Sequence, residues 1–179
     1  MAKAIKTIFI HQSDSNWGSA IIIDKWHRDK GWSAIGYQYV IGNGYSSAED
    51  RREGRKFDEL EGNIEYGRPL DLDGILEPSE VGAQVYGRNS DSIGICLIHK
   101  DMPYTLTMIF SLITLIRSLM KRFNIPVEEI IGHYEVDTKK PQCPSIDMPQ
   151  FRKDLATFID LGSGISKGKM YELFVKYCQ

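Results

Sequence analysis

Three side chains in this sequence combine residue types and positions that suit metal chemistry. His11 follows the apolar run "TIFI", His133 follows "EEIIG", and Cys143 lies further along the same segment as His133. Ligand groups commonly emerge where strands of an α/β sheet end, so neighbouring strands would bring the two imidazoles together. Two neutral imidazoles and one thiolate are a donor set typical of zinc, with a fourth position left for water. No short CxxC or HExxH motif fixes the geometry of the site.

The segment "HYEVDTKKPQCPSID" also permits other interpretations. Cys143 could be a nucleophile with His133 as its base, and Asp137 or Asp147 would then orient the imidazole. That arrangement leaves His11 without a role. Cys143 could also be an idle thiol in a loop. The residues alone leave these alternatives open.

The remaining histidines suit structural positions. His27 lies in an expected helix beside Trp26, which favours a packed or surface role. His99 ends an apolar run next to Lys100, which favours a surface position over a ligand. Tyr37 lies in "GYQY", where an aromatic side chain usually packs. Beside a metal, its phenol would instead donate a hydrogen bond to a developing oxyanion or hold the attacking water.

The elements that must position these residues alternate between strand-like and helix-like segments. Apolar residues at helical spacing in "YTLTMIFSLITLIRSLMKRFNI" predict a long helix that faces the core. The alternation predicts an α/β domain. Strands are expected at 6–11, 36–44, 63–69, 92–99 and 127–133, and helices at 20–31, 104–125, 148–162 and 170–178. The segment 46–62 carries charges of both signs and is interpreted as a solvated helix or a long loop.

The bulk properties favour one globular domain. The chain has 179 residues, of which 42% are hydrophobic and 26% charged. A net charge of −2 gives no support for a nucleic-acid or membrane-surface binder, so we expect neither partner. Three cysteines are too few for a disulfide framework, and no signal peptide is recognised at the start of the chain. We therefore expect a monomer that is cytoplasmic at synthesis.

Four blocks of sequence, taken together and in order, resemble a known family. They are "IFIHQSDS", "IDKWHRDKGWSAIGYQYVI", "VGAQVYGRNSDSIGICLI" and "IIGHYEVD…CPSID", and they span about residues 7 to 160. They resemble the type 2 zinc-dependent N-acetylmuramoyl-L-alanine amidases, which include bacteriophage lysozyme-type endolysins and share the peptidoglycan-recognition-protein fold. The resemblance implies a central mixed β-sheet flanked by helices. It also implies hydrolysis of the amide between the lactyl group of N-acetylmuramic acid and L-alanine in peptidoglycan.

The resemblance also implies roles for individual residues. By motif position, His11, His133 and Cys143 would be the ligands of Zn²⁺, and Tyr37 would be the catalytic tyrosine. Zinc would polarise the lactyl carbonyl and lower the pKa of a water, while Tyr37 would donate to the oxyanion. The substrate would be the muramyl peptide of peptidoglycan. An endolysin of this kind would act on the cell wall after its release.

The chain departs from the family pattern at three places. Family members commonly carry a catalytic lysine two residues before the last ligand, where this chain has Pro141, so we expect Lys140, or else Lys139, to supply that charge. Gln84 replaces the histidine of the usual "GAH", and we expect it to alter contacts in the groove. The charged stretch at 46–75 is longer than in compact relatives, which suits a flap, a surface for a protein partner or a tolerated insertion.

Two rival classes remain within the same fold. One is a non-catalytic module that only binds peptidoglycan, and such a module would be expected to lack the cysteine or the tyrosine. The other is a regulatory protein that uses the charged insertion to bind a protein partner. We expect residues 1–162 to form the amidase domain, and 163–179 to be a linker and a short helix packed on that domain.

Overall fold

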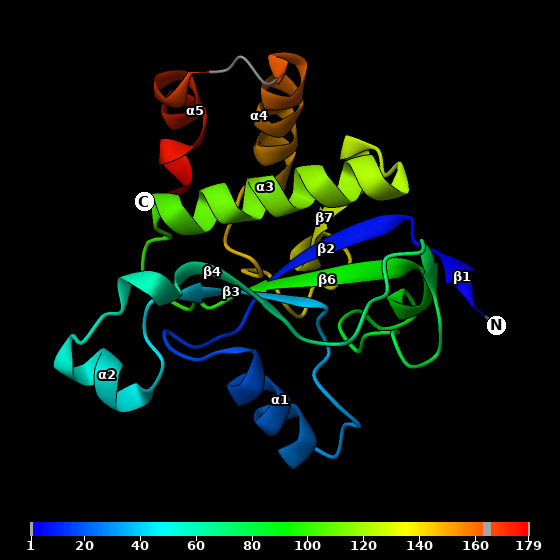
Figure 1. The fold of residues 1–179 in the computed structure, drawn as a ribbon, viewed down its shortest axis with the longest axis horizontal. Helices are drawn as coiled ribbons and strands as arrows, with labels where there is room; N and C mark the ends of the chain where they lie inside the picture. The colour runs from blue at the N-terminus through cyan, green and yellow to red at the C-terminus, as the bar shows by residue number, and fades with distance from the viewer. Residues whose placement is uncertain (1, 163–165, 179) are drawn as a thin grey trace.

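A five-stranded mixed sheet lies at the centre of the computed structural model, which describes residues 2–162 and 166–178 (Figure 1). Its strands lie in the order β4–β3–β6–β2–β7. β2 is parallel to both β6 and β7, β3 is parallel to β6, and β4 is antiparallel to β3. Their bounds are β2 (Thr7–Gln12), β3 (Tyr39–Asn43), β4 (Glu61–Tyr66), β6 (Ser92–Leu97) and β7 (Ile130–Gly132). The expected central mixed sheet flanked by helices is confirmed.

Helices cover both faces of this sheet. Figure 1 shows α1 on one side, and α3 on the other side together with α4 and α5. Ser19 begins α1 by accepting a hydrogen bond from Ile22 N–H, and Asn124 ends α3 in the left-handed conformation. The bounds are α1 (Ala20–Asp29), α2 (Ala48–Glu53), α3 (Leu106–Phe123), α4 (Met148–Asp160) and α5 (Lys167–Phe174).

Short elements account for most differences from the expected boundaries. A two-stranded antiparallel sheet of β1 (Lys3–Ala4) and β5 (Ile75–Leu76) is not anticipated, because two-residue strands show no periodicity. The charged segment at 46–62 contains α2 and the start of β4. Single-turn 3₁₀ helices complete the description: η1 (Asp58–Leu60), η2 (Asn89–Asp91), η3 (Val127–Glu129), η4 (His133–Glu135) and η6 (Val175–Cys178).

Successive strand residues alternate between two cores. Ile10 and Leu97 belong to the larger core beneath α3. Cys96 belongs to the smaller core with Ile23 of α1. Because side chains alternate along a strand, His11 faces away from the larger core, on the same side of the sheet as its register partner Cys96. Because of this alternation, the buried side chain of His11 lies near the end of β2 on the face of the sheet that α1 covers.

The C-terminal segment, which comprises α5 and η6, packs against α4. Phe174 is fully buried, and its ring lies 6.2 Å from that of Phe151 and 5.8 Å from that of Phe158. The Tyr177 hydroxyl donates to the buried carboxylate of Asp154. α5 begins at Lys167, inside the stretch expected to be a link, because the Ser166 hydroxyl accepts from Lys169 N–H. The first residues of that stretch, 163–165, lie outside the described residues.

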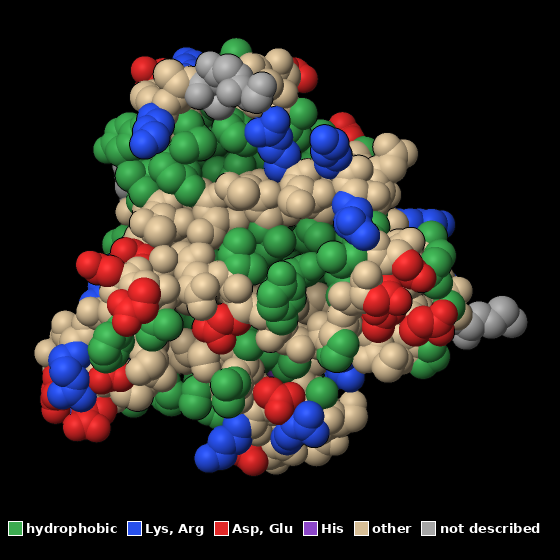
Figure 2. All heavy atoms as spheres, in the orientation of Figure 1, with side chains coloured by type: hydrophobic (Ala, Val, Ile, Leu, Met, Phe, Trp, Pro, Cys, Tyr) green, Lys and Arg blue, Asp and Glu red, His purple; other side chains and the backbone are tan. Residues whose placement is uncertain are grey.

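The surface carries charges of both signs. Figure 2 shows basic and acidic side chains together over α2, at the lower left of the face drawn. Among the residues that the structure describes, no helix has the length and apolar character needed to cross a membrane.

Truncation of Phe174 tests the packing of the C-terminal segment. We expect Phe174→Ala to lower the free energy of unfolding by about 3–5 kcal/mol, because a fully buried ring is removed. Denaturant unfolding measures this change. The control is Tyr171→Ala on the same helix, where the side chain is 50% exposed and the loss should stay within about 0.5 kcal/mol. Equal effects of the two substitutions would contradict the packing.

Candidate metal centre

The pairing of two parallel strands brings the predicted histidines together. Ile10 of β2 is in register with Gly132 of β7, so His11 and His133 follow paired positions. Their Nδ1 atoms lie 3.1 Å apart. Two nitrogen lone pairs at this distance repel one another unless a proton or a cation lies between them. The arrangement therefore suits two ligands of one ion.

Cys143 completes the cluster from the loop before α4. Its Sγ lies 3.9 Å from His11 Nδ1 and accepts a hydrogen bond of 3.3 Å from the backbone N–H of Gln12. The three candidate ligand atoms all lie within 4.8 Å of one another. Two nitrogens on a tetrahedral zinc ion would be about 3.3 Å apart, given Zn–N bonds of about 2.0–2.1 Å. The donor types and their spacing thus fit a zinc-like ion.

A clamp from α4 holds the turn that carries His133. The Arg152 guanidinium donates to both carboxylate oxygens of Glu135, at 2.7 and 2.8 Å, and to the carbonyl of Ile130. The Glu135 carboxylate in turn accepts from Gly132 N–H at 2.8 Å. Bidentate pairs of this kind fix orientation as well as distance. β7 has only three residues, so its end depends on these contacts for its position.

Burial keeps the cluster uncharged when no metal is bound. It lowers the pKa of His11 to about 3, with a further contribution from His133, while the hydrogen bond to Gln84 acts in the opposite direction. It raises the pKa of the Cys143 thiol to about 11 against the effect of the Gln12 N–H. A cation entering the site would therefore displace the thiol proton. The high pKa of the thiol also argues against Cys143 as a free nucleophile, because the thiolate is the reactive form.

Tyr37 and Lys140, the two predicted catalytic residues, adjoin the cluster. The Tyr37 ring lies 5.0 Å from the His11 ring, and burial raises the pKa of its phenol well above 10, so the phenol remains a donor. Burial dominates the pKa shifts of His133 and Cys143, and the exposed Lys140 ammonium lowers both pKa values. Lys139 is also exposed, and its backbone N–H donates to the Asp137 carboxylate at 2.9 Å.

The two other histidines lie outside the cluster and are buried. His27 Nδ1 accepts from Gly36 N–H at 3.0 Å, and burial lowers its pKa to about 4. The expected surface position of His99 is wrong. Its ring stacks on Tyr104 with 3.8 Å between centroids, because the loop after β6 carries Tyr104 over the strand end.

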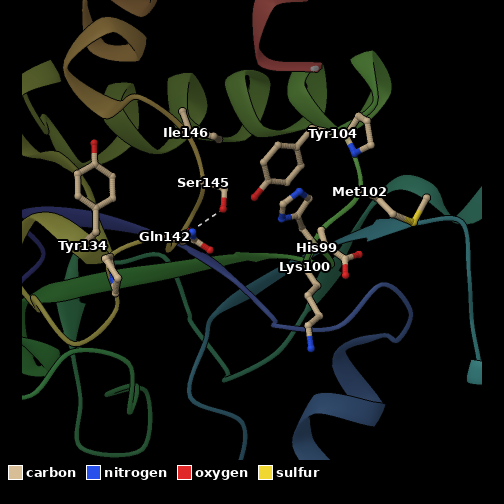
Figure 3. Close-up of a pocket in the computed structure, with 11 residues that line it drawn as sticks. His99, Lys100, Met102, Tyr104, Tyr134, Gln142, Ser145 and Ile146 are labelled. Atoms are coloured by element: carbon tan, nitrogen blue, oxygen red, sulfur yellow. Dashed lines mark hydrogen bonds between the residues drawn. The ribbon is translucent and has the colours of Figure 1, made fainter.

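A cavity of about 550 Å³ opens beside the cysteine loop (Figure 3). Figure 3 shows Tyr134 on one side, Tyr104 with His99 on the other, and Gln142 and Ser145 between them. Gln142 and Ser145 flank Cys143 in the sequence, so the cavity adjoins the candidate metal centre. Aromatic faces with nearby amide and hydroxyl groups suit a ligand that has both apolar and polar parts.

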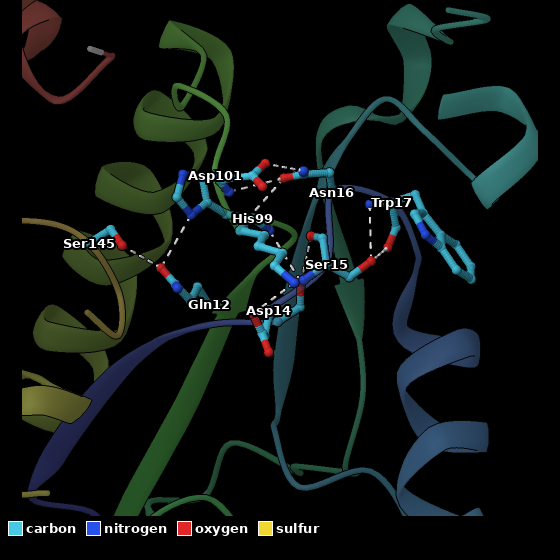
Figure 4. A network of polar contacts seen from close by, with 10 residues as sticks. Gln12, Asp14, Ser15, Asn16, Trp17, His99, Asp101 and Ser145 are labelled. Carbon is cyan, nitrogen blue, oxygen red and sulfur yellow. Dashed lines mark hydrogen bonds and ion pairs between the residues drawn. The ribbon is translucent and has the colours of Figure 1, made fainter. Parts of the chain in front are cut away.

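Gln12 ties the strand end to the cysteine loop and was not anticipated from the sequence. Figure 4 shows its side chain between Ser145 and His99. Acceptors surround the amide, so its NH₂ group is assigned toward the loop, 3.0 Å from the carbonyl oxygens of Gln142 and Pro144. In the same network the Asn16 amide donates a hydrogen bond to the Asp101 carboxylate in the loop after β6. In the sequence, the only indication of a role for Gln12 was its position directly after His11.

Gln84 is also placed differently from the expectation. It is buried behind His11, with its Oε1 atom 2.9 Å from His11 Nε2, and does not merely alter contacts in an open groove. The hydrogen bond joins residues 73 positions apart in the sequence, across an irregular loop. No periodic pattern could have revealed it.

Comparison with known proteins decides the family. The family model described as N-acetylmuramoyl-L-alanine amidase matches residues 1–146, which include His11, His133 and Cys143. The chain belongs to the N-acetylmuramoyl-L-alanine amidase family. The amidase-family chain is 28% identical to the endolysin of Enterobacteria phage K11 over 138 residues, which are 73% of this chain and 72% of the endolysin.

Solved structures agree with this assignment. The amidase-family chain is similar to the N-acetylmuramoyl-L-alanine amidase LysC from Clostridium intestinale URNW, with a TM-score of 0.64 and 25% identity over 88% of this chain and 86% of LysC. Drosophila PGRP-LB shares the fold, with a TM-score of 0.55 and 20% identity over 80% of this chain and 79% of PGRP-LB. The predicted family and peptidoglycan-recognition-protein fold are therefore confirmed.

The buried histidines predict how stability depends on pH without metal. The folded-state pKa values of about 3 for His11 and about 4 for His27 lie below the value of about 6.5 expected in an unfolded chain. In that window the unfolded state binds more protons, so stability is lost as the pH falls below about 6.5. We expect a loss of about 1 kcal/mol for each histidine by about pH 5.5.

Urea unfolding with a chelator present, at about pH 7.5 and about pH 5.5, measures this loss. A His27→Gln variant should lose less stability than the parent chain on acidification, because one buried histidine is absent. Equal unfolding midpoints of the parent chain at both pH values would contradict the expected neutral, buried histidines.

Proposed function

We propose that this amidase is a zinc enzyme that cleaves the amide between the lactyl group of N-acetylmuramic acid and L-alanine in peptidoglycan, and that it acts on the cell wall as an endolysin does. The observation that carries the proposal is the convergence of His11 Nδ1, His133 Nδ1 and Cys143 Sγ within 4.8 Å. The matched family and the endolysin relative support the substrate and the site of action.

Zinc is the ion that best suits this donor set. Two imidazoles and a thiolate are borderline to soft ligands, whereas magnesium and calcium prefer oxygen. Three protein ligands also correspond to a catalytic zinc site, since structural zinc sites usually have four. When bound, zinc would supply Lewis acidity toward the scissile carbonyl and make a water molecule more acidic.

The residues around the ligands suit stabilisation of an oxyanion. The Tyr37 phenol stays protonated because burial raises its pKa, so it is available to donate a hydrogen bond as negative charge develops on the carbonyl oxygen. Lys140 adds a positive charge near His133 and Cys143. We propose Lys140 over Lys139 because the positive charge of Lys140 lowers the pKa values of His133 and Cys143.

The cavity beside Cys143 is proposed to hold part of the muramyl peptide. Tyr134 offers an aromatic ring for apolar contact, and Gln142 and Ser145 offer groups that bond amides or hydroxyls. We also propose that residues 1–162 form the amidase domain and that 163–179 are a linker and a helix that pack on it. The burial of Phe174 and Tyr177 supports that division.

Digestion of purified peptidoglycan tests the reaction and the metal together. We expect mass spectrometry to detect free stem peptides that begin with L-alanine, and a zinc chelator to abolish their release. Cys143→Ala should lose both zinc and activity, since a ligand is removed. The control is Cys178→Ala, which removes a cysteine outside the cluster. Release of disaccharides would contradict the amidase reaction, and binding without cleavage would favour a peptidoglycan-binding module.

Substitutions of Tyr37 and Lys140 test the proposed catalytic residues. We expect Tyr37→Phe to lower kcat about a hundredfold or more, which corresponds to about 3 kcal/mol of transition-state stabilisation, and to leave zinc bound. Lys140→Met should also lower kcat and leave zinc bound. The matched controls are Tyr39→Phe, within the larger core, and Lys139→Met. Rates and metal content are measured together. A rate loss in Lys139→Met but not in Lys140→Met would reassign the lysine.

A further inference from the structure

The outer nitrogen of His11 has a buried partner that is not itself a candidate ligand. His11 Nδ1 faces His133 and Cys143, and His11 Nε2 lies 2.9 Å from Gln84 Oε1. His11 is 1% exposed and Gln84 8% exposed, so water does not substitute for this contact. An amide oxygen only accepts hydrogen bonds, so the proton must lie on His11 Nε2.

The orientation of the Gln84 amide follows from its other contacts. The Gln84 NH₂ group lies 3.2 Å from Ser92 Oγ and 3.4 Å from the carbonyl oxygen of Ser92. The Ser92 hydroxyl donates its own proton to the Arg88 carbonyl at 2.6 Å, so Ser92 Oγ is left to accept from Gln84. Each donor is thereby assigned: His11 donates to Gln84, Gln84 donates to Ser92, and Ser92 donates to the Arg88 carbonyl.

The backbone around Gln84 is shaped to hold this contact. Asn89 Oδ1 accepts from the backbone N–H groups of both Gln84 and Val85, at 2.8 Å each, which fixes the loop. Across from the amide, Gly94 of β6 has no side chain. A Cβ atom at that position would overlap Gln84 Oε1, so a glycine is needed for the glutamine to reach His11.

We propose that Gln84 is the positioning residue of the metal centre, which holds His11 with the proton on Nε2 and so leaves Nδ1 free to bind zinc. This inference depends on the zinc site proposed above. Partners of this kind orient a metal-bound histidine and raise its basicity, and their loss commonly weakens metal binding about 10- to 100-fold. His133 differs, because its Nε2 lies 3.7 Å from the partly exposed Asp137 carboxylate, beyond a direct hydrogen bond.

Zinc affinity, measured by competition with a chromophoric chelator, tests the role of Gln84. We expect Gln84→Met to weaken zinc binding about 10- to 100-fold, because methionine has a similar shape but offers His11 no comparable acceptor. Gln84→Glu keeps an acceptor and should restore affinity to within about threefold of the parent chain. The visible spectrum of the cobalt-substituted protein should change in Gln84→Met and recover in Gln84→Glu.

The matched control is Gln38→Met. Gln38 is also buried and also makes two side-chain hydrogen bonds. It accepts from Gly94 N–H at 2.7 Å and donates to the Glu80 carbonyl at 2.8 Å, and neither partner is a histidine. Its substitution should lower stability and leave zinc affinity unchanged. Loss of affinity in both variants would overturn the positioning role, since general loosening of the fold would explain it.

Nitrogen-15 NMR of the histidine rings in the metal-free parent chain provides a test that needs no variant. We expect His11 to carry its proton on Nε2 at neutral pH. A proton on Nδ1, or zinc affinity of Gln84→Met within about threefold of the parent, would overturn the role of Gln84 alone. Absence of zinc binding by the parent chain would overturn the proposed metal centre as well.

Discussion

The parallel pairing of β2 with β7 is the interaction on which the site depends. It places His11 and His133 after paired positions and leaves their Nδ1 atoms 3.1 Å apart. β7 is a three-residue edge strand, so this pairing cannot hold its end alone. The Arg152–Glu135 clamp from α4 supplies the missing support. The geometry of the candidate metal centre thus depends on both the sheet and α4.

Burial shapes the chemistry of the cluster. In an environment of low polarity the uncharged forms are favoured, so the metal-free site holds neutral imidazoles and a protonated thiol. A divalent cation changes this balance, because it attracts the thiolate and the nitrogen lone pairs at once. The same burial keeps the Tyr37 phenol protonated. Burial therefore sets the protonation states of both the candidate ligands and the proposed hydrogen-bond donor.

The sequence reveals the parts of the site that lie at the ends of periodic segments. His11 and His133 end apolar runs, and the long helix α3 follows from helical spacing, so both could be predicted. The burial of His99 depends on stacking with Tyr104 from the following loop, and the contact of Gln84 with His11 crosses an irregular segment. Such contacts are set by tertiary packing, which leaves no local pattern. Which of Lys140 and Lys139 lies nearer the cluster likewise depends on the conformation of the loop that precedes Cys143, and the sequence does not reveal that conformation.

The packing of α4 shows that the segment matched by the family model is shorter than the segment that forms the packed core. The match to the family model ends at residue 146, immediately before α4 begins at Met148. Yet Met148, Phe151 and Leu155 are fully buried in the core beneath the sheet. A fragment cut at the end of the family match would keep every candidate metal ligand and expose an apolar face of its own sheet. The segment that carries the chemistry is therefore shorter than the segment that must fold.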